Sequence, residues 1–344
     1  MNIALGSVPD QGHAATLASK GILAGYLLVC VAIIAAAFFA FSKYRDGVEQ
    51  ATEGDLVAFT HFKKFMLEET LRIHMADARM FATRQAVWRV LDPASTPVAP
   101  AQQALEHLVE QTKAGYGYWR IFVFDPKLKP VYPAGTTAIP AAVSAALAAA
   151  TRTREPAIVD IHRNSRGETT FGVASPVFAN GDRAGAVAGT VFLEVDLRQA
   201  LLSIVDSWPT SPSSTGETML VRREGADILY LTPMRKHPGE PALTIRRPAS
   251  DSTLFASAAL TATSGAILGK LDYTGSPVIG ATSRIAGTSW ILVSKIDAAE
   301  ATREILALAW VTSALAAVFI FLTGAIAYLL WKNRQAATYS RNAR

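Results

Sequence analysis

Two long stretches without any charged side chain dominate the pattern of hydrophobic and polar positions along the chain. Residues 21–41 and residues 305–331 are uncharged throughout. Each is as long as the roughly 20 residues with which a helix crosses the hydrocarbon core of a bilayer. We therefore predict transmembrane helices over residues 21–42 and 305–331, with a large folded region between them.

A long helical stalk is predicted directly after the first span. From residue 43 to residue 91 the chain contains no proline and two glycines, and the proline-rich stretch that follows would stop a helix. We predict one helix over residues 43–92. Apolar residues recur in it every seven positions, which is a helical period. This stripe would either pack on the chain's own sheets or form part of a dimer seam, and the two are compatible; its members are Phe59, Met66, Ile73, Met80 and Val87.

After a helix predicted over residues 100–113, the pattern changes to strands separated by turns. The Asn-Gly pair at 180–181 is a strong hairpin signal. In the strand after it, apolar residues alternate up to Leu197, so we expect one buried face and one more polar face. The remaining strands are predicted at 118–125, 130–134, 156–164 and 169–179, with a short helix at 140–151.

The same order of elements occurs twice along the chain. A proline- and serine-rich stretch, residues 207–216, is interpreted as a break between two modules, residues 100–206 and 207–297. In the second module, "MLVRREGADILYLTP" aligns with "IFVFDPKLKPVYP" of the first, and "SWILVSKID" aligns with "GTVFLEVDL". Local strand pairing with helices to one side is an α+β pattern. The sequence therefore predicts a duplicated sheet module.

The charged residues around the two spans predict the orientation in the membrane. The basic tail, residues 332–344, contains four Lys or Arg residues and no acid, and such tails are retained in the cytoplasm. With two spans, residues 1–20 are then also cytoplasmic and residues 43–304 are extracytoplasmic. A cleaved signal peptide is the alternative for the first segment, but its apolar core would be shorter. We therefore predict a two-pass protein of the bacterial inner membrane.

Composition narrows the class of protein further. The chain has 344 residues, 50% of them hydrophobic, and a net charge of +5, to which the basic tail contributes four charges. The single cysteine, Cys30, lies in the first span, so we expect neither disulfides nor thiolate metal sites in the outer region. Nothing in the charge distribution favours binding of nucleic acid.

The order of these elements resembles double Cache sensors, the extracytoplasmic input regions of bacterial histidine kinases, diguanylate cyclases and chemoreceptors. The residues that carry the resemblance are 207–248 and "LGKLDYTGSPVIGATSRIAGTSWILVSKID". It implies an α+β fold with a long N-terminal stalk helix and two tandem PAS-like (Cache) antiparallel-sheet modules, flanked by two transmembrane helices. In such receptors a small ligand usually binds the membrane-distal module, here 100–206, and the membrane-proximal module, here 207–297, leads to the second span.

The resemblance also implies partners. A homodimer is expected, and an output domain is expected either beyond this sequence or in a separate cytoplasmic protein, because 13 residues follow the second span. The arrangement Arg-x-Trp-Tyr that marks amino-acid-binding relatives is not found, so amino acids are not favoured; an organic anion is considered instead. No cofactor is expected.

Candidate ligand contacts are polar and aromatic residues on or beside the predicted strands of the first module. An arginine would pair with a carboxylate or phosphate, and an aspartate would accept from an amine or hydroxyl. The alternatives are that Arg120 and Asp160 pair with each other, that the tyrosines are half-buried packing, and that His162 and Arg163 form a solvated strand end. The candidates are Tyr118, Arg120, Tyr132, Asp160, His162 and Arg163.

Other possible sites carry weaker signals. A basic group in the second module is interpreted as a solvated face or an anion site; it contains Arg222, Arg223, Arg235 and Lys236. His61 and His74 are 13 residues apart on the stalk, which does not suit a metal pair. No hydrolase or phosphate-binding motif is present, so we expect no catalytic residues. The alternatives to a sensor are a doubly anchored scaffold protein and, less favoured, a membrane-tethered hydrolase.

Overall fold

The computed structural model describes residues 11–92, 98–134, 139–208, 213–262 and 264–342. These residues form two compact units. The helical unit contains the chain up to Thr52 and from Ala301 onward, and the α+β unit contains Glu53–Glu300. The start of the predicted N-terminal segment, the middle of the 207–216 break and the end of the basic tail lie outside the described residues.

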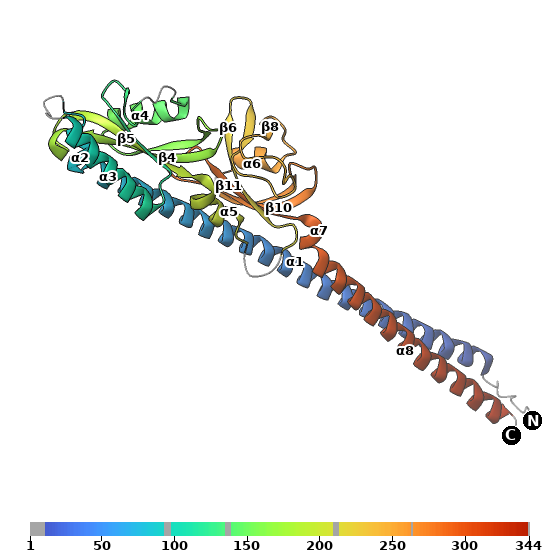
Figure 1. Cartoon of the computed structure of the whole chain (residues 1–344). Coiled ribbons are helices and arrows are strands. Elements are labelled where there is room, and N and C mark those ends of the chain that lie inside the picture. The colour runs from blue at the N-terminus through green and yellow to red at the C-terminus, as the bar shows by residue number, and fades with distance from the viewer. Residues whose placement is uncertain (1–10, 93–97, 135–138, 209–212, 263, 343–344) are drawn as a thin grey trace, which may run out of the picture. The chain divides into compact units, whose positions relative to one another are not determined.

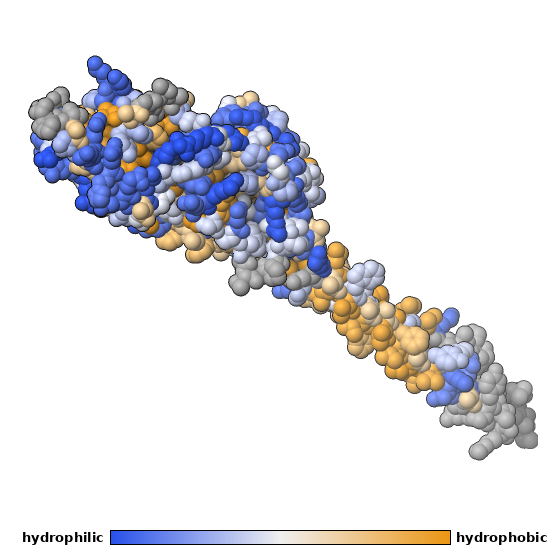
Figure 2. All heavy atoms as spheres, in the orientation of Figure 1, coloured by the Kyte–Doolittle hydropathy of each residue, from blue (hydrophilic) through white to orange (hydrophobic). Residues whose placement is uncertain are grey.

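The helical unit consists of the first part of α1 (Gln11–Ala82) and of α8 (Arg303–Asn342). Both helices are long and apolar enough to cross a membrane, and Figure 2 shows hydrophobic residues along most of this unit. The two helices meet at Gly324, where the hydroxyl of Tyr26 donates to the Ile320 carbonyl oxygen at 3.4 Å. A Cβ on Gly324 would lie 3.1 Å from that hydroxyl, so glycine allows the close approach.

The predicted stalk is part of the same continuous helix as the first span and ends ten residues earlier than predicted. α1 ends at Ala82, and a separate short helix, α2 (Gln85–Arg89), follows. The hydroxyl of Thr83 donates to the Met80 carbonyl oxygen, and Arg84 has an extended backbone (ψ 136°). These two features stop the helix before the proline-rich stretch is reached.

The first module (residues 100–206) is a five-stranded antiparallel sheet with the order β2-β1-β5-β4-β3. α4 (Ala141–Thr153) covers one face, and α1 with α3 (Val98–Tyr116) covers the other (Figure 1). β5 is therefore buried on both faces, including the face that was predicted to be more polar. The strands are β1 (Arg120–Phe124), β2 (Pro130–Tyr132), β3 (Ala157–Arg163), β4 (Thr169–Phe178) and β5 (Val187–Asp196).

The second module (residues 207–297) is a six-stranded antiparallel sheet with the order β8-β7-β6-β11-β10-β9. α6 (Phe255–Thr261) packs on one face, and apolar residues of the other face share a core with α1. Two short helical segments, η2 (Arg198–Leu202) and α5 (Ser203–Asp206), connect the modules. The strands are β6 (Glu217–Glu224), β7 (Asp227–Tyr230), β8 (Arg246–Pro248), β9 (Ser264–Leu271), β10 (Pro277–Arg284) and β11 (Ile291–Asp297).

The predicted duplication is visible in the strand order. β7-β6-β11-β10-β9 of the second sheet corresponds to β2-β1-β5-β4-β3 of the first, and β8 is an additional edge strand. The two segments aligned from sequence, which become β5 and β11, occupy the same central position. The predicted Asn-Gly turn is also present, with positive φ at Asn180 (57°) and Gly181 (75°), inside the connection between β4 and β5.

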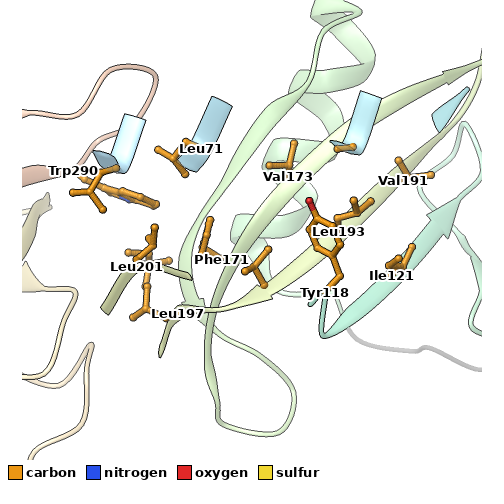
Figure 3. Packing of buried hydrophobic residues seen from close by; sticks show 14 of the residues in the cluster. Leu71, Tyr118, Ile121, Phe171, Val173, Val191, Leu193, Leu197, Leu201 and Trp290 are labelled. Atoms are coloured by element: carbon orange, nitrogen blue, oxygen red, sulfur yellow. The ribbon is translucent and has the colours of Figure 1, made fainter. Parts of the chain in front are cut away.

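One of the three hydrophobic clusters joins the two modules and α1. Trp290, immediately before β11, lies with its ring centroid 6.1 Å from that of Phe171 on β4, and Leu71 of α1 belongs to the same cluster (Figure 3). Both sheets accordingly fall within one compact unit. The 207–216 stretch separates two sheets and does not separate two independently packed cores.

The buried face of α1 differs from the predicted seven-residue stripe. Leu67, Leu71 and Ala78 are buried against the sheets. In contrast, Met66, Ile73 and Met80 remain 37%, 47% and 41% exposed, and Phe62 and Phe65 are more exposed still. Packing of the stripe on the chain's own sheets is therefore wrong for these positions. The dimer seam stays a prediction.

Candidate functional site

A cavity of about 350 Å³ lies on the α4 side of the first sheet. Its floor comes from the neighbouring central strands β1 and β5, one side from the end of β3 and the loop after it, and the other from the start of α4. The lining residues are Arg120, Phe122, Phe124, Pro133, Ile139, Pro140, Val143, His162, Asn164, Ser165, Arg166, Phe192 and Glu194. Concave sites of this size with apolar walls and few polar groups are typical of small-molecule sites.

Three phenylalanine rings form an apolar wall of this cavity. Phe122 and Phe192 are direct partners across β1 and β5, with ring centroids 5.7 Å apart and planes inclined by 15°. Phe124, two residues along β1, has its centroid 6.2 Å from that of Phe122 and an inclination of 19°. The pleat of β1 and the register with β5 thus place three nearly parallel rings on one face.

A buried ion pair lies beside the aromatic wall. Arg120 and Glu194 are also direct partners across β1 and β5, and Arg120 Nε is 2.5 Å from Glu194 Oε2. The other carboxylate oxygen accepts from the Thr170 hydroxyl at 3.0 Å. Glu194 is almost completely buried, so this carboxylate depends on its two partners for stabilisation.

His162 lies at the polar end of the cavity because β3 contains a bulge. Between Val159 and His162, β3 has one residue more than its partner β4. Val159 packs in the cluster on the α4 side and Ile161 packs in the core on the α1 side, and the extra residue returns His162 to the α4 side. His162 Nδ1 lies 2.8 Å from the carbonyl oxygen of Asp160.

The loop after β3 supplies the remaining polar groups. The Asn164 side-chain oxygen accepts from the backbone N–H groups of Arg166 (2.9 Å) and Glu168 (3.1 Å), and its amide donates to the Glu168 carboxylate. Gly167 has a positive φ of 79°, which closes the turn. Asn164 therefore shapes the loop, while Ser165 and the exposed Arg166 face the cavity from it.

Of the six candidate residues predicted from sequence, the cavity brings together Arg120 and His162. Tyr118 lies on the opposite side of the sheet, where its hydroxyl donates to Asp77 at 2.8 Å and its ring packs in the core with α1 (Figure 3). Tyr132 is half-buried at the edge of that core. The alternative that the tyrosines are half-buried packing is correct for Tyr132. The alternative that His162 belongs to a solvated strand end is wrong, because His162 is buried.

Asp160 and Arg163 connect the first module to the second. The Asp160 carboxylate lies 2.8 Å from Arg222 of β6 and accepts from Ser289 Oγ at 2.9 Å and from Trp290 Nε1. Arg163 donates to the Ala242 carbonyl oxygen at 2.8 Å. The predicted pairing of Arg120 with Asp160 is therefore wrong, because each has a different partner.

The basic residues of the second module do not form one cluster. Arg222 binds Asp160 and Glu224, whereas Arg223 donates to the Gly225 carbonyl oxygen on an exposed turn. Arg235 donates to the Gly216 carbonyl oxygen at 2.8 Å, and Lys236 lies 3.0 Å from Asp297. These four residues therefore do not form the predicted anion site, because each contacts a different acidic group or carbonyl oxygen.

Histidines of the stalk show no metal-site geometry. His61 is exposed, and His74 Nδ1 lies 2.9 Å from the Tyr118 hydroxyl. Within the described part of the chain, no three His, Cys, Asp or Glu side chains are placed to hold a metal ion.

Sequence analysis missed the aromatic wall and Glu194. A signal was present for both, because Thr190, Phe192 and Glu194 alternate with the apolar residues of β5. A buried strand whose second face carries a carboxylate and an aromatic residue suggests a lined cavity. The more polar face of this strand was predicted, but its burial against a cavity was not.

No family model matches the chain, and no curated protein matches it. Solved structures do. The sensory domain of the Campylobacter jejuni chemoreceptor Tlp3 is 10% identical, with a TM-score of 0.52, over 75% of this chain and 98% of that one. The ligand-binding domain of the Pseudomonas aeruginosa amino acid chemoreceptor PctB with L-Gln is 17% identical, with a TM-score of 0.50, over 73% and 93%.

The ligand-binding domain of the Pseudomonas fluorescens chemoreceptor CtaA, in complex with L-leucine, is also similar. It is 14% identical with a TM-score of 0.50, over 74% of this chain and 99% of that one. At such identities the likeness concerns the fold. The chain has the α+β fold of chemoreceptor sensory domains, which confirms the predicted double Cache architecture.

Proposed function

We propose that this chain is a two-pass membrane receptor whose α+β unit binds a small molecule in the cavity of the first module and transmits its presence to the second span. The observation that carries the proposal is the cavity itself, which combines three parallel aromatic rings with a few convergent polar groups. Three structures with the same fold are described as sensory or ligand-binding domains. In this proposal the chain itself is not a catalyst.

The membrane orientation follows from the charges at the ends of α8. The tail after residue 331 contains Lys332 and Arg334 and no acid, which favours retention in the cytoplasm. Both termini are then cytoplasmic and the α+β unit is extracytoplasmic, on the periplasmic side of the inner membrane. The output lies in a cytoplasmic domain or partner protein reached through the second span.

A strand of the first module offers a route from the cavity to the second module. His162 lines the cavity and bonds to the backbone of Asp160, whose carboxylate accepts from Ser289 Oγ and Trp290 Nε1 immediately before β11. A ligand that displaces the end of β3 therefore acts on β11. The coupling free energy in such systems is about 1–3 kcal/mol.

The segment that follows β11 is held by hydrogen bonds to the residues before β6. α7 (Ala298–Ala301) begins directly after Asp297. The Glu300 carboxylate accepts from the backbone N–H groups of Ser214 (3.0 Å) and Thr215 (2.9 Å), just before β6. Displacement of β11 is thereby conveyed to the first helical turn that follows it. Insertion of four glycines after Asp297 should abolish the ligand response and leave ligand affinity unchanged; a response that survives the insertion contradicts this route.

A homodimer is proposed from the exposed stripe of α1. Met66, Ile73 and Met80 lie one above the other at seven-residue spacing and remain exposed in the single chain. Single cysteines at Met66 or Met80 in a Cys30→Ser background should cross-link two copies in membranes. Cysteine at Thr83, exposed just beyond the end of α1, is the control and should not cross-link; equal cross-linking at all three positions would contradict the seam.

Ligand binding is tested by filling the cavity. Ile139 lines it just before α4, and Ala148 lies on the exposed face of α4. A thermal-shift screen of soluble small molecules on the full chain in nanodiscs should give hits that Ile139→Trp removes and Ala148→Trp retains. A chain without any hit, or hits that persist in Ile139→Trp, would reject the cavity and favour an anchored scaffold.

A further inference from the structure

The residues that line the cavity carry one positive charge in excess. Their charged side chains are Arg120, Arg166 and Glu194, and Arg120 is paired with Glu194. Burial lowers the pKa of His162 below its ordinary value, so this ring adds no charge near neutral pH. Arg166 is exposed, and no ion pair joins it to a carboxylate in the described part of the chain. An anion that enters the cavity can therefore bind the Arg166 guanidinium.

The loop on which Arg166 lies does not supply the missing negative charge. Its one acidic residue, Glu168, accepts from the Asn164 amide at 3.1 Å and does not line the cavity. Residues 135–138, which stand in the sequence between two lining residues, contain no acid. A ligand carboxylate would supply this charge, because a guanidinium can donate two hydrogen bonds to it in one plane.

The cavity offers no comparable partner to a ligand cation. The Glu194 side chain is 2% exposed, and its oxygens already accept from Arg120 and from the Thr170 hydroxyl. The Asn164 side-chain oxygen accepts from two backbone N–H groups of its own loop. An ammonium group in the cavity would thus lie near two guanidinium groups without a carboxylate of its own, which is unfavourable.

The remaining walls are largely apolar. Burying the apolar part of a ligand against such side chains is favourable, whereas a second charged group would lose its water there without gaining a partner. A carboxylate carries one negative charge and matches the single excess guanidinium, whereas a phosphate monoester carries about −1.5 to −2. The apolar side chains are Phe122, Phe124, Ile139, Val143 and Phe192.

The loop that carries Arg166 is also joined to the second module. Arg163, at the end of β3, donates to the Gly167 carbonyl oxygen of this loop at 3.0 Å and to the Ala242 carbonyl oxygen of the second module at 2.8 Å. A ligand bound to Arg166 therefore contacts a segment that is tied to the second module, in keeping with the route along β3.

We propose that the cavity binds a monocarboxylate with an apolar body and no ammonium group, and that its carboxylate pairs with the Arg166 guanidinium. The proposal rests on the proposed function and narrows it to one chemical class of ligand. Within the organic anions considered from the sequence, it selects those with one charge, and it excludes amino acids. The excess charge at Arg166, the occupied oxygens of Glu194 and the apolar walls each support a different part of it.

Three probes with the same carbon skeleton test the proposal. 3-Phenylpropanoate carries a carboxylate alone, L-phenylalanine adds an ammonium group, and 3-phenylpropanamide has an uncharged amide in place of the carboxylate. Calorimetry on the full chain in nanodiscs near neutral pH should show 3-phenylpropanoate binding at least about tenfold more tightly than either of the other two.

Variants of Arg166 assign the preference for a carboxylate to this residue. Arg166→Gln removes the charge, so 3-phenylpropanoate and 3-phenylpropanamide should bind it about equally; Arg166→Lys retains the charge and should keep part of the preference. Arg152→Gln is the control and should behave as the wild type, because Arg152 is exposed near the end of α4 and does not line the cavity. Circular dichroism verifies folding of each variant.

The outcomes separate this inference from the proposed function. Equal binding of 3-phenylpropanoate and 3-phenylpropanamide to the wild type, binding of L-phenylalanine as tight as that of 3-phenylpropanoate, or a preference that persists in Arg166→Gln would overturn the monocarboxylate inference. Binding of other small molecules that Ile139→Trp removes, without binding of 3-phenylpropanoate, would also overturn it and leave the receptor function in place. No small-molecule binding at all would reject both.

Discussion

Lys63 of α1 is a buried lysine whose ionisation makes the stability of the α+β unit depend on pH. Its side chain is 1% exposed, and Nζ donates to the Val205 carbonyl oxygen and to Thr218 Oγ1 (3.1 Å) and lies 4.6 Å from the Phe59 ring centroid. Burial lowers the pKa of Lys63 to about 7, and the nearby Asp206 carboxylate offsets part of this effect. The folded chain thus releases this proton at a lower pH than the unfolded chain.

The size of the effect follows from the two pKa values. A fall from 10.5 to about 7 corresponds to roughly 5 kcal/mol of unfavourable free energy in the folded state when the amine must be charged. Between these values the unfolded chain binds the proton and the folded chain does not, so stability rises with pH. From about pH 7.5 to 9 the free energy of unfolding should increase by about 2 kcal/mol through this residue.

Urea unfolding of the full chain in detergent, followed by tryptophan fluorescence at several pH values, measures this increase. Lys63→Met should remove the increase, because methionine has similar length and no charge to lose. Lys64→Met, at the next position, is the control: its amine reaches Glu68 at 2.7 Å on the helix surface, and the increase should remain. Parallel pH profiles for the wild type and Lys63→Met would refute the assignment.

Two further substitutions test the packing of the sheets. Lys295→Met removes the cation shared by the buried carboxylates of Glu217 (3.1 Å) and Asp272 (2.9 Å), and should lower the free energy of unfolding by about 3–5 kcal/mol in the same urea assay. Gly172→Ala places a Cβ 2.1 Å from the Leu193 carbonyl oxygen in the middle of the first sheet, and should cost about 3 kcal/mol with a lowered urea midpoint.

Each of these substitutions has a matched control. Lys270→Met removes a half-buried lysine of β9 whose amine donates to the Ser252 carbonyl oxygen at 2.8 Å, and should change stability by no more than about 1 kcal/mol. Gly115→Ala introduces a Cβ with no atom within 4 Å near the end of α3 and should be neutral or stabilising by up to about 1 kcal/mol. Losses in the controls equal to those in the test variants would show that the stated contacts are not the cause.

Most strands and hairpins were predictable from sequence because their signals are local, whereas the pairing of β1 with β5 and of β6 with β11 is long-range. Alternating apolar residues and turns such as Asn180-Gly181 mark each hairpin, and the duplication placed β5 and β11 at equivalent positions. The buried face of α1 was not predictable in the same way. Several stripes along α1 contain apolar residues at seven-residue spacing. Which of these stripes meets the sheets depends on long-range packing at Leu67 and Leu71.

The site was less accessible to sequence reasoning than the fold. Arg120 was a candidate, but its partner Glu194 is 74 residues away and is set by the register of β1 with β5. His162 was also a candidate, yet strict alternation along β3 would place it on the face opposite to Val159. The bulge reverses this, and no residue type in β3 announces it.

Different strands of the first module form the cavity wall and contact the second module. β1, β5 and the loop at 164–166 supply most of the cavity wall, whereas β3 alone carries both His162 and Asp160. Substitutions in β1, β5 or the loop can therefore change which ligand binds, while the contacts of β3 with the second module stay the same. Deletion of one residue from β3 would leave the residues of β1 and β5 in place but turn the His162 imidazole to the other face of the sheet. The cavity would then lose its connection through β3 to the second module.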